Sequence, residues 1–206
     1  DLHSGQTCGF FSNNCPMDNL YNEVYFVDYI KYHIIPEFGD NIVIVAPDEG
    51  AVKSATRVSG KLNVSAATIF KNRERANVVG SMCLMGDVNG KVAILIDDMI
   101  DTAGTACKAA SILKENGASY IFMLATHGLF SGPALERINE SDFNKIVVTN
   151  TVSQKREILE CNKIKIIDVS WIIAEAIKRQ HDGTSLSELY LNGDVLRNNS
   201  GVTFVN

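Results

Sequence analysis

Short apolar runs alternate with longer amphipathic stretches along the chain. Several of the apolar runs have strand length and are continuous in Val, Ile and Leu, without a polar residue at every second position. Such runs are typical of strands that are buried on both faces of a sheet. The predicted strands are Ile42–Ala46, Ala66–Phe70, Val92–Ile96, Tyr120–Ala125, Ile146–Val148 and Lys165–Val169.

Helix-like patterns separate most of these predicted strands. An alternation of strands and helices predicts an α/β fold, with a parallel sheet flanked by helices and right-handed crossovers. The tail after Tyr190 has turn signals at Asn192-Gly193, compatible with a short hairpin or with irregular structure. The predicted helices are Tyr21–His33, Ala51–Leu62, Thr105–Asn116, Pro133–Glu140 and Ser170–His181.

Composition narrows the class of protein. A hydrophobic content of 46% and a charged content of 21% indicate an ordinary globular chain. The net charge of −5 provides no basic field for nucleic acid or for an anionic membrane, and no apolar run approaches the roughly 18 residues of a membrane span. The 5 cysteines are scattered without a C-x-x-C pair, which favours free thiols in a reducing cytoplasm.

The stretch "DDMIDTAGT" follows a predicted strand and has the features of a phosphate-binding loop. Ligands of open α/β sheets bind beyond the carboxyl ends of the strands. Gly104 lets the backbone approach a ligand closely, and Thr102 and Thr105 offer hydroxyl donors. Unpaired amides at the start of the following helix attract anions. The residues therefore predict a monophosphate site, although no Walker A loop is present.

Two adjacent carboxylates, Asp97 and Asp98, suit a different part of the same ligand. They could accept hydrogen bonds from vicinal sugar hydroxyls, directly or through a divalent cation. A phosphate at one end and a diol at the other describe ribose 5-phosphate. The alternative is a solvated strand end and helix cap, but a cap needs one carboxylate, and Asp101 makes this a group of three.

The stretch "VIVAPDEGAVKSA" offers a second possible anion site after another strand. Gly50 breaks the strand, Lys53 lies in the opening turn of the next helix pattern, and Asp48 could reach a metal bound to the anion. A plain strand–turn–helix connection explains these residues as well. The choice between the two stays open on this stretch alone.

A basic stretch, "FKNRERANVVG", follows the second predicted strand. Lys71, Arg73 and Arg75 lie where neither helical nor strand periodicity is clear. A basic segment of this kind could fold over a polyphosphate and neutralise charge during phosphoryl-type transfer. A solvated charged turn is the alternative.

Several of these stretches together resemble one family. "ILIDDMIDTAGT" resembles the fingerprint shared by type I phosphoribosyltransferases and the synthetases of phosphoribosyl diphosphate (PRPP). "DLHSGQTCGFF", "KNRERAN", "THGLFSGPA", "VVTNT" and "IIAEAIKRQHDGTSLSELY" look like PRPP synthetase motifs and occur in family order. The resemblance covers Asp1–Tyr190, and it implies a type I phosphoribosyltransferase-like sheet.

The resemblance also implies a reaction and roles for residues. ATP and ribose 5-phosphate would give AMP and PRPP, with Mg²⁺ as cofactor. Asp97 and Asp98 would bind the ribose hydroxyls and the metal, and His3 and Asp48 would position the metal and the ATP phosphates. The remaining implied assignments are Asp101, Thr102, Ala103, Gly104 and Thr105 for the 5-phosphate, Lys53 for the diphosphate, and Lys71 and Arg73 for a catalytic loop.

Regulation, assembly and domains follow only from the resemblance. Asp18, Ser185, Leu186 and Tyr190 match positions near an allosteric site, and family members are commonly hexamers built from dimers. The chain reads as the C-terminal part of the family protein: residues 1–20 as a remnant of the N-terminal domain, 21–175 as the phosphoribosyltransferase-like domain, and 176–206 as a segment packing toward the N-terminal half. We therefore expect the chain alone to lack most of the adenine site and to make little or no PRPP.

Two other functions remain alternatives. A type I phosphoribosyltransferase would leave "DLHSGQ" and "KNRERAN" unexplained. A non-catalytic PRPP-synthetase-associated regulatory protein would have degraded phosphate and basic loops, whereas both are intact in this sequence.

Overall fold

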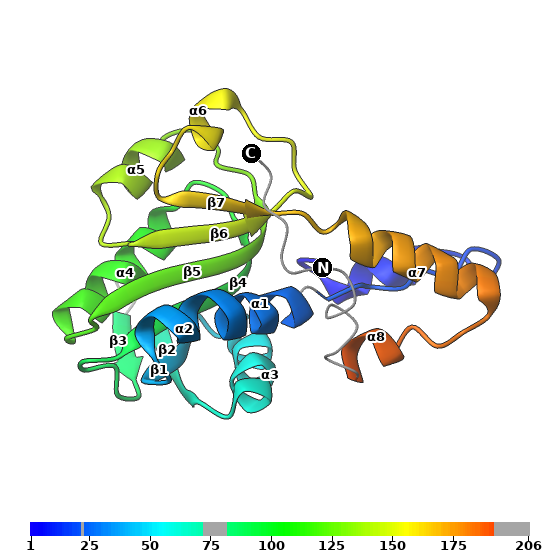
Figure 1. Cartoon of the computed structure of the whole chain (residues 1–206). Coiled ribbons are helices and arrows are strands. Elements are labelled where there is room, and N and C mark those ends of the chain that lie inside the picture. The colour runs from blue at the N-terminus through cyan, green and yellow to red at the C-terminus, as the bar shows by residue number, and fades with distance from the viewer. Residues whose placement is uncertain (22, 72–81, 192–206) are drawn as a thin grey trace.

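A seven-stranded sheet forms the centre of the molecule, in the order β3-β2-β1-β4-β5-β6-β7 (Figure 1). The structure is a computed structural model that describes residues 1–21, 23–71 and 82–191. The strands are β1 (Ile42–Ala46), β2 (Ser65–Lys71), β3 (Met82–Met85), β4 (Val92–Ile100), β5 (Tyr120–Gly128), β6 (Lys145–Thr149) and β7 (Ile164–Ile167).

The predicted α/β class is confirmed, with one correction to the parallel sheet. The pairs β1–β2, β1–β4, β4–β5, β5–β6 and β6–β7 are parallel, but β3 runs antiparallel to β2 at the edge. β3 was missed because its four residues alternate between half-buried and exposed. Its sequence, Met-Cys-Leu-Met, is apolar throughout, but a run of four residues is too short to identify a strand by itself.

Helices cover both faces of the sheet. The predicted helix from Tyr21 becomes a longer unit, in which α1 continues through a π-helical stretch, η2, into α2. The short helices α6 and α8 and the 3-10 turn η1 were not predicted. The elements are η1 (Gly5–Phe10), α1 (Glu23–Tyr29), η2 (Ile30–Ile34), α2 (Ile35–Phe38), α3 (Val52–Leu62), α4 (Gly104–Glu115), α5 (Ala134–Glu140), α6 (Arg156–Leu159), α7 (Ser170–Asp182) and α8 (Glu188–Leu191). Among the described residues, no helix is long and apolar enough to cross a membrane.

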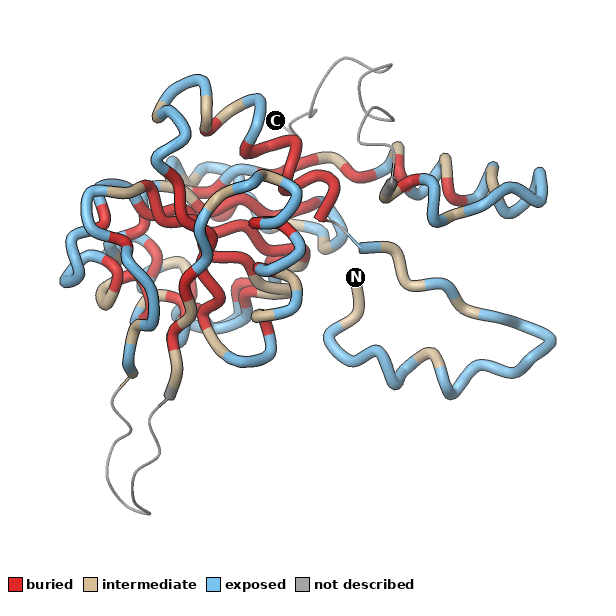
Figure 2. The backbone as a smooth tube through the Cα atoms, turned by 90° about the horizontal axis from the view of Figure 1, so that it is seen from below, coloured by how far each residue is buried: buried red, intermediate tan, exposed pale blue. Residues whose placement is uncertain are grey.

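Alternate residues of each strand belong to two separate cores. In β4, Ala93 and Leu95 pack with α4 and α5, whereas Ile94 and Ile96 pack with α1, α3 and α7. This alternation follows from the two-residue period of a strand. Both faces are therefore buried, as the continuous apolar runs predict, and the tube in Figure 2 is buried along most of the central strands.

The strand order places a ligand-binding edge between β1 and β4. Connections from β1 lead toward β2 on one side, while β4 leads toward β5 on the other. A reversal of this kind is the topological switch point where α/β sheets bind ligands. β4 is longer than predicted and reaches Ile100, so Asp97 and Asp98 lie within the strand instead of after it.

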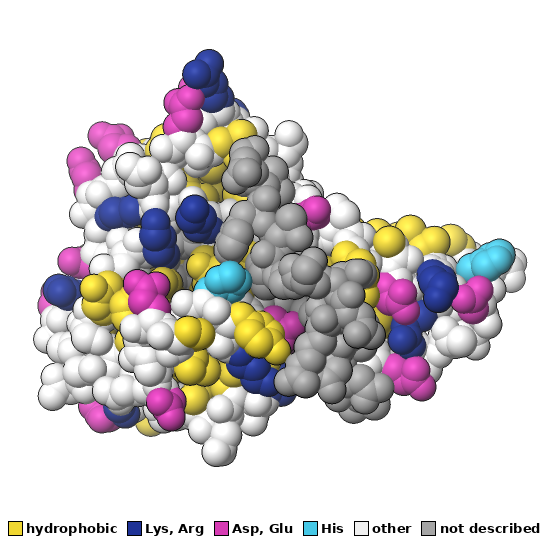
Figure 3. Space-filling model, in the orientation of Figure 1, with side chains coloured by type: hydrophobic (Ala, Val, Ile, Leu, Met, Phe, Trp, Pro, Cys, Tyr) yellow, Lys and Arg dark blue, Asp and Glu magenta, His cyan; other side chains and the backbone are white. Residues whose placement is uncertain are grey.

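One part of the chain stands away from this body. Residues 1–18 and α7 extend to one side of the sheet in Figure 1, and no residue among 1–18 is buried. In α7, Ile172 and Ala176 join the core, whereas Ile173 and Ile177 are 45% and 62% exposed. Apolar side chains are visible along the outer side of α7 in Figure 3.

Candidate active site at the ends of β1, β4 and β5

The loop after β4 has the backbone expected of an anion site. Ala103, the N-cap of α4, is left-handed with a φ of 59° and makes no side-chain capping hydrogen bond. None of the hydrogen bonds between described residues uses the amides of Thr102, Ala103, Gly104 or Thr105. Asp101, Thr102, Gly104 and Thr105 are exposed, and Ala103 is buried. The structure thus gives no support to the helix-cap alternative, and it leaves amides at the helix start available to an anion.

Hydrogen bonds from the loop after β5 hold this phosphate loop (Asp101–Thr105) against the body. The amides of Leu129 and Phe130 donate to the carbonyl of Ile100 at 2.8 and 3.3 Å, and the amide of Ser131 donates to the carbonyl of Asp101 at 3.1 Å. Phe130 is itself left-handed, with a φ of 49°. Backbone hydrogen bonds therefore join two loops that each contain a left-handed non-glycine residue, Ala103 and Phe130.

Asp97 and Asp98 form a carboxylate pair with unequal proton affinity. Burial, followed by the hydrogen bond with Asp98, raises the pKa of Asp97 to about 7. Burial alone would raise the pKa of Asp98, but hydrogen bonds from Asp97 and His3 outweigh it and lower the pKa. Two adjacent half-buried carboxylates cannot both ionise cheaply. A second negative charge on this pair is therefore costly near neutral pH, and a bound cation would offset that cost.

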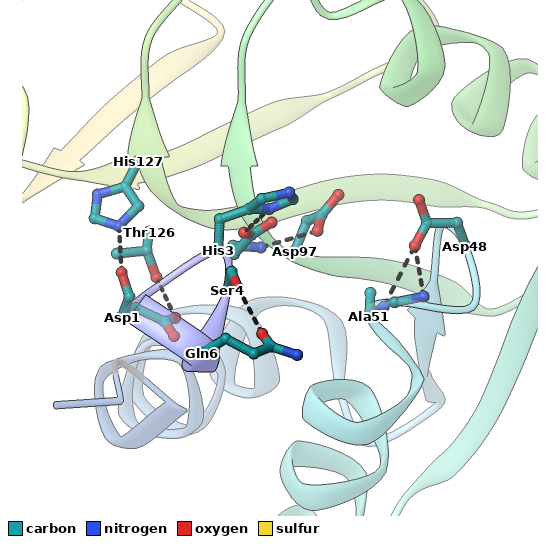
Figure 4. Close-up of polar contacts among 11 residues, drawn as sticks. Asp1, His3, Ser4, Gln6, Asp48, Ala51, Asp97, Thr126 and His127 are labelled. Carbon is teal, nitrogen blue, oxygen red and sulfur yellow. Dashed lines mark hydrogen bonds and ion pairs between the residues drawn. The ribbon is translucent and has the colours of Figure 1, made fainter. Parts of the chain in front are cut away.

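His3 reaches this pair from the N-terminal segment. Its Nδ1 lies 2.6 Å from Oδ2 of Asp98, and this hydrogen bond raises the pKa of His3. Asp1 fastens the same segment to β5, because its carboxylate accepts from Thr126 Oγ1 at 2.8 Å and its carbonyl lies 2.7 Å from Nε2 of His127. The structure thus brings His3 to the β4 end, as the resemblance implies (Figure 4).

Asp48 lies on the opposite side of Asp97 from His3 in Figure 4. Its Oδ1 accepts hydrogen bonds from the amides of Gly50 and Ala51 at 2.9 and 3.3 Å, just before α3. Its charge contributes to the raised pKa of both Asp97 and His3. Asp48 therefore stabilises the turn and adds negative charge to the site. Lys53 is exposed in the first turn of α3.

The donor set fits a divalent cation that substrate and water help to hold. No three His, Cys, Asp or Glu side chains within residues 1–21, 23–71 and 82–191 gather into a metal site by themselves. Mg²⁺, however, usually takes one or two carboxylates and completes its shell with phosphate oxygens and water. Asp97 and Asp98 provide such a pair, with His3 and Asp48 beside it. The arrangement of these four residues is compatible with a Mg²⁺ site, and their role as metal ligands stays a prediction.

Two sets of predicted residues are placed less fully. Arg73 and Arg75 lie outside the described residues, and Lys71 ends β2 with a side chain that is not described. Of the predicted allosteric residues, Leu186 packs against the core, and Tyr190 accepts a hydrogen bond from the Tyr21 amide at 3.1 Å. Asp18 accepts one from Gln180 on α7 at 3.1 Å, and Ser185 is exposed. These roles remain predictions.

Sequence reasoning missed the contacts that reach the site from distant positions. Arg137 on α5 donates through Nη1 to the Thr102 carbonyl at 2.9 Å. Thr126 and His127 anchor Asp1. The stretch "THGLFSGPA" was recognised as a motif of the resembled family, but a separation of 35 residues between Arg137 and Thr102 leaves no local pattern.

Comparisons with known proteins bear on the fold and the family of this chain. The sequence profile of the family described as the phosphoribosyl synthetase-associated domain matches residues 74–191. The crystal structure of phosphoribosylpyrophosphate synthetase from Mycobacterium smegmatis is similar over 89% of this chain, with 33% sequence identity and a TM-score of 0.78. The chain spans 57% of the length of that protein.

Two phosphoribosyltransferases are more distantly similar. The purine phosphoribosyltransferase from Pyrococcus horikoshii matches 66% of this chain and 79% of its own, at 17% identity and a TM-score of 0.40. The adenine phosphoribosyltransferase (APRTase) from Giardia lamblia matches 61% and 77%, at 13% identity and a TM-score of 0.48. Values this low carry no argument about function.

Proposed function

Because the chain belongs to the phosphoribosyl synthetase-associated domain family, we propose that it binds ribose 5-phosphate, and that the protein containing it transfers the diphosphoryl group of ATP to the 1-hydroxyl of that sugar. The products are PRPP and AMP. The new bond joins the sugar oxygen to the β-phosphorus, and the bond between the α-phosphate and the β-phosphorus breaks. Since the chain spans 57% of the M. smegmatis protein, the complete reaction is proposed for the whole protein.

One observation carries the proposal: the carboxylate pair and the phosphate loop lie on one strand and its continuation. Asp97 and Asp98 lie in the last four residues of β4, which ends at Ile100, and Asp101–Thr105 follow directly. In the proposal, free amides and the hydroxyls of Thr102 and Thr105 bind the 5-phosphate, and the carboxylates accept hydrogen bonds from the 2- and 3-hydroxyls. The sugar is then fixed at both ends.

In the proposal, a sugar fixed in this way presents its 1-hydroxyl to ATP phosphates held near Asp48 and His3, which lie on either side of Asp97 in Figure 4. Holding two reactants in the right geometry is worth several orders of magnitude in rate. Bound Mg²⁺ would supply charge neutralisation on the diphosphate, and Asp97 and Asp98 would hold it together with substrate oxygens. Lys71 and Arg73 would neutralise the transferring group, a role assigned from sequence alone.

Calorimetric titration of ribose 5-phosphate in Mg²⁺ tests the binding half of the proposal. We expect saturable binding by the 206-residue chain and a loss of about tenfold in affinity in Thr102→Ala and in Thr105→Ala, because each change removes a hydroxyl donor from the loop. Thr56→Ala is the matched control, since Thr56 is exposed on α3 and bonds only to the Val52 carbonyl. Equal affinity in all four proteins would reject the phosphate loop.

The catalytic half is tested on the whole protein by measuring AMP and PRPP together. We expect equal amounts of both products from ATP and ribose 5-phosphate. The 206-residue chain alone should form little or no PRPP, as expected above. Release of inorganic phosphate without PRPP would contradict the diphosphoryl transfer.

The family description is also compatible with a second candidate, a non-catalytic protein associated with PRPP synthetase. Such a protein could retain ribose 5-phosphate binding and yet form no product, so the product assay separates the two functions. Consumption of PRPP with nucleobases would instead indicate a phosphoribosyltransferase. We also propose that the whole protein acts in the cytoplasm as a homo-oligomer, whose size can be measured by light scattering.

A further inference from the structure

Arg137 on α5 lies against the backbone of the phosphate loop. Its Nη1 donates to the carbonyl oxygen of Thr102 at 2.9 Å. The same nitrogen lies 3.3 Å from the point where a Cβ on Gly104 would stand. The guanidinium therefore contacts the loop at the residues that begin α4, and glycine at position 104 leaves room for it.

The backbone around Ala103 is restrained from both sides. The carbonyl before it, on Thr102, accepts from Arg137, and its own carbonyl accepts from the Cys107 amide at 2.9 Å. A non-glycine residue keeps a left-handed φ only where the surrounding structure fixes it. Without the Arg137 bond, the peptide between Thr102 and Ala103 would lose one of these restraints and could rotate.

Arg137 also brings an uncompensated positive charge to the loop. The ion pairs between described residues use Arg57, Arg156 and Arg179 among the arginines, and none of those pairs includes Arg137. A guanidinium keeps its charge at any working pH. Positive charge near the start of α4 favours a dianion there, in addition to the helix amides.

We propose that Arg137 is a positioning residue for the 5-phosphate of the ligand. It holds the Thr102 carbonyl away from the ligand, keeps Ala103 left-handed so that the amides at the start of α4 stay available, and adds charge beside them. The inference rests on the proposed function, because it names the side chain that shapes the loop of that same site.

The test compares Arg137→Ala, Arg137→Lys and Arg156→Ala with the unchanged chain. Arg156 is the matched control, because it is an exposed arginine on α6 whose partner is Glu160. We expect Arg137→Ala to weaken the calorimetric affinity for ribose 5-phosphate, and for inorganic phosphate as a smaller probe, by about tenfold. Arg137→Lys keeps the charge and a donor and should recover at least half of that loss on a logarithmic scale.

A merely structural role predicts a different pattern. The affinity for Mg²⁺ alone depends on Asp97 and Asp98. It should change less than about twofold in Arg137→Ala if the substitution perturbs only the phosphate loop. Equal losses for Mg²⁺ and phosphate, or no loss of phosphate affinity, would overturn the positioning role. If Arg137→Ala does not fold, Arg137→Gln and Arg137→Lys carry the same comparison. An unchanged chain that binds no ribose 5-phosphate would instead reject the proposed function itself.

Discussion

The phosphate loop and the N-terminal segment, residues 1–18, meet at the same strand ends but are held there differently. The loop continues from a buried strand and is tied to the β5–α5 segment by backbone hydrogen bonds and Arg137. The N-terminal segment has no buried residue and is attached through Asp1, His3 and Asp18. One half of the site is therefore preorganised by the core, and the other depends on a few exposed polar contacts.

This difference suggests a division of labour within the proposed site. Precise orientation of a bound group requires side chains and amides fixed by packing. The sugar-phosphate half meets that condition, because α4 packs Ala109, Ala110 and Leu113 into the core. The N-terminal segment that carries His3 has no buried residue, so packing does not fix that side of the site. Substitutions should therefore act differently on the two regions.

The largest contrast is expected in stability. Leu113→Ala removes a fully buried side chain of α4 and should lower the free energy of unfolding by about 2–5 kcal/mol. Phe10→Ala removes a side chain that is 89% exposed in the N-terminal segment and should change it by less than about 0.5 kcal/mol. Urea denaturation measures both, and similar losses in the two variants would remove the contrast.

The next effect is expected at the left-handed residue of the loop. Ala103→Val places a β-branched side chain at a φ of 59° and at a buried position, which should cost about 2 kcal/mol. Ala103→Gly relieves the backbone strain, so its unfolding free energy should stay within about 1 kcal/mol of the parent. Urea denaturation and ribose 5-phosphate titration test the pair. A valine variant with normal stability and affinity would contradict the account of the loop.

A smaller effect is expected where α7 leaves the body. Asp168 accepts hydrogen bonds from the Ser170 amide at 2.9 Å and from Asn150 at 2.8 Å. Asp168→Ala should therefore lower the free energy of unfolding by about 1 kcal/mol at neutral pH. Denaturant titration gives this difference, and Ser187→Ala on the exposed turn before α8 is a suitable control.

The Asp168 effect should also depend on pH, with a defined sign. Hydrogen bonds from the Ser170 side chain and amide hold the pKa of Asp168 below its ordinary value. A lowered folded-state pKa stabilises the fold above the unfolded-state value of about 3.9. The advantage over Asp168→Ala should therefore persist at pH 5 to 7 and disappear as the pH falls below about 4. A constant difference down to pH 2 would contradict the ionised contact.

The smallest effect is expected at His3. Its side chain is 74% exposed, so His3→Ala should change the free energy of unfolding by less than about 0.5 kcal/mol. Its affinity for ribose 5-phosphate should also stay within about twofold, because His3 meets the sugar-phosphate half through one exposed hydrogen bond to Asp98 and has none to the phosphate loop among the described residues. Calorimetry on the variant measures this. A large loss would show that the N-terminal segment shapes the sugar site as well.

Most of the sheet could be predicted from sequence because buried strands have continuous apolar runs. Ile42–Ala46 matched β1 to the residue, whereas Val92–Ile96 ended too early, since charged Asp97 and Asp98 continue β4. The edge strand β3 was missed because it is short and half exposed. Its four apolar residues show neither the length of a buried strand nor the apolar and polar alternation of a strand with one exposed face.

Some residues of the candidate site could likewise be found from a local sequence pattern, and others could not. The phosphate loop could be found from sequence because its glycine, threonines and strand end are consecutive. Arg137 could not, because 35 residues separate it from Thr102 and only the packing of α5 on α4 brings them together. The contact of His3 with Asp98, across 95 residues, was expected only from the family resemblance. Tertiary contacts of this range leave no local signal in a single sequence.

The most direct test of the central claim follows the backbone amides of the phosphate loop by NMR. ¹⁵N-labelled chain is titrated with ribose 5-phosphate in Mg²⁺, and with ribose as the control ligand. The account predicts saturable shifts for the amides of Ala103, Gly104 and Thr105 with the phosphorylated sugar and much smaller shifts there with ribose. Unchanged loop amides at saturation, or equal shifts with ribose, would contradict it.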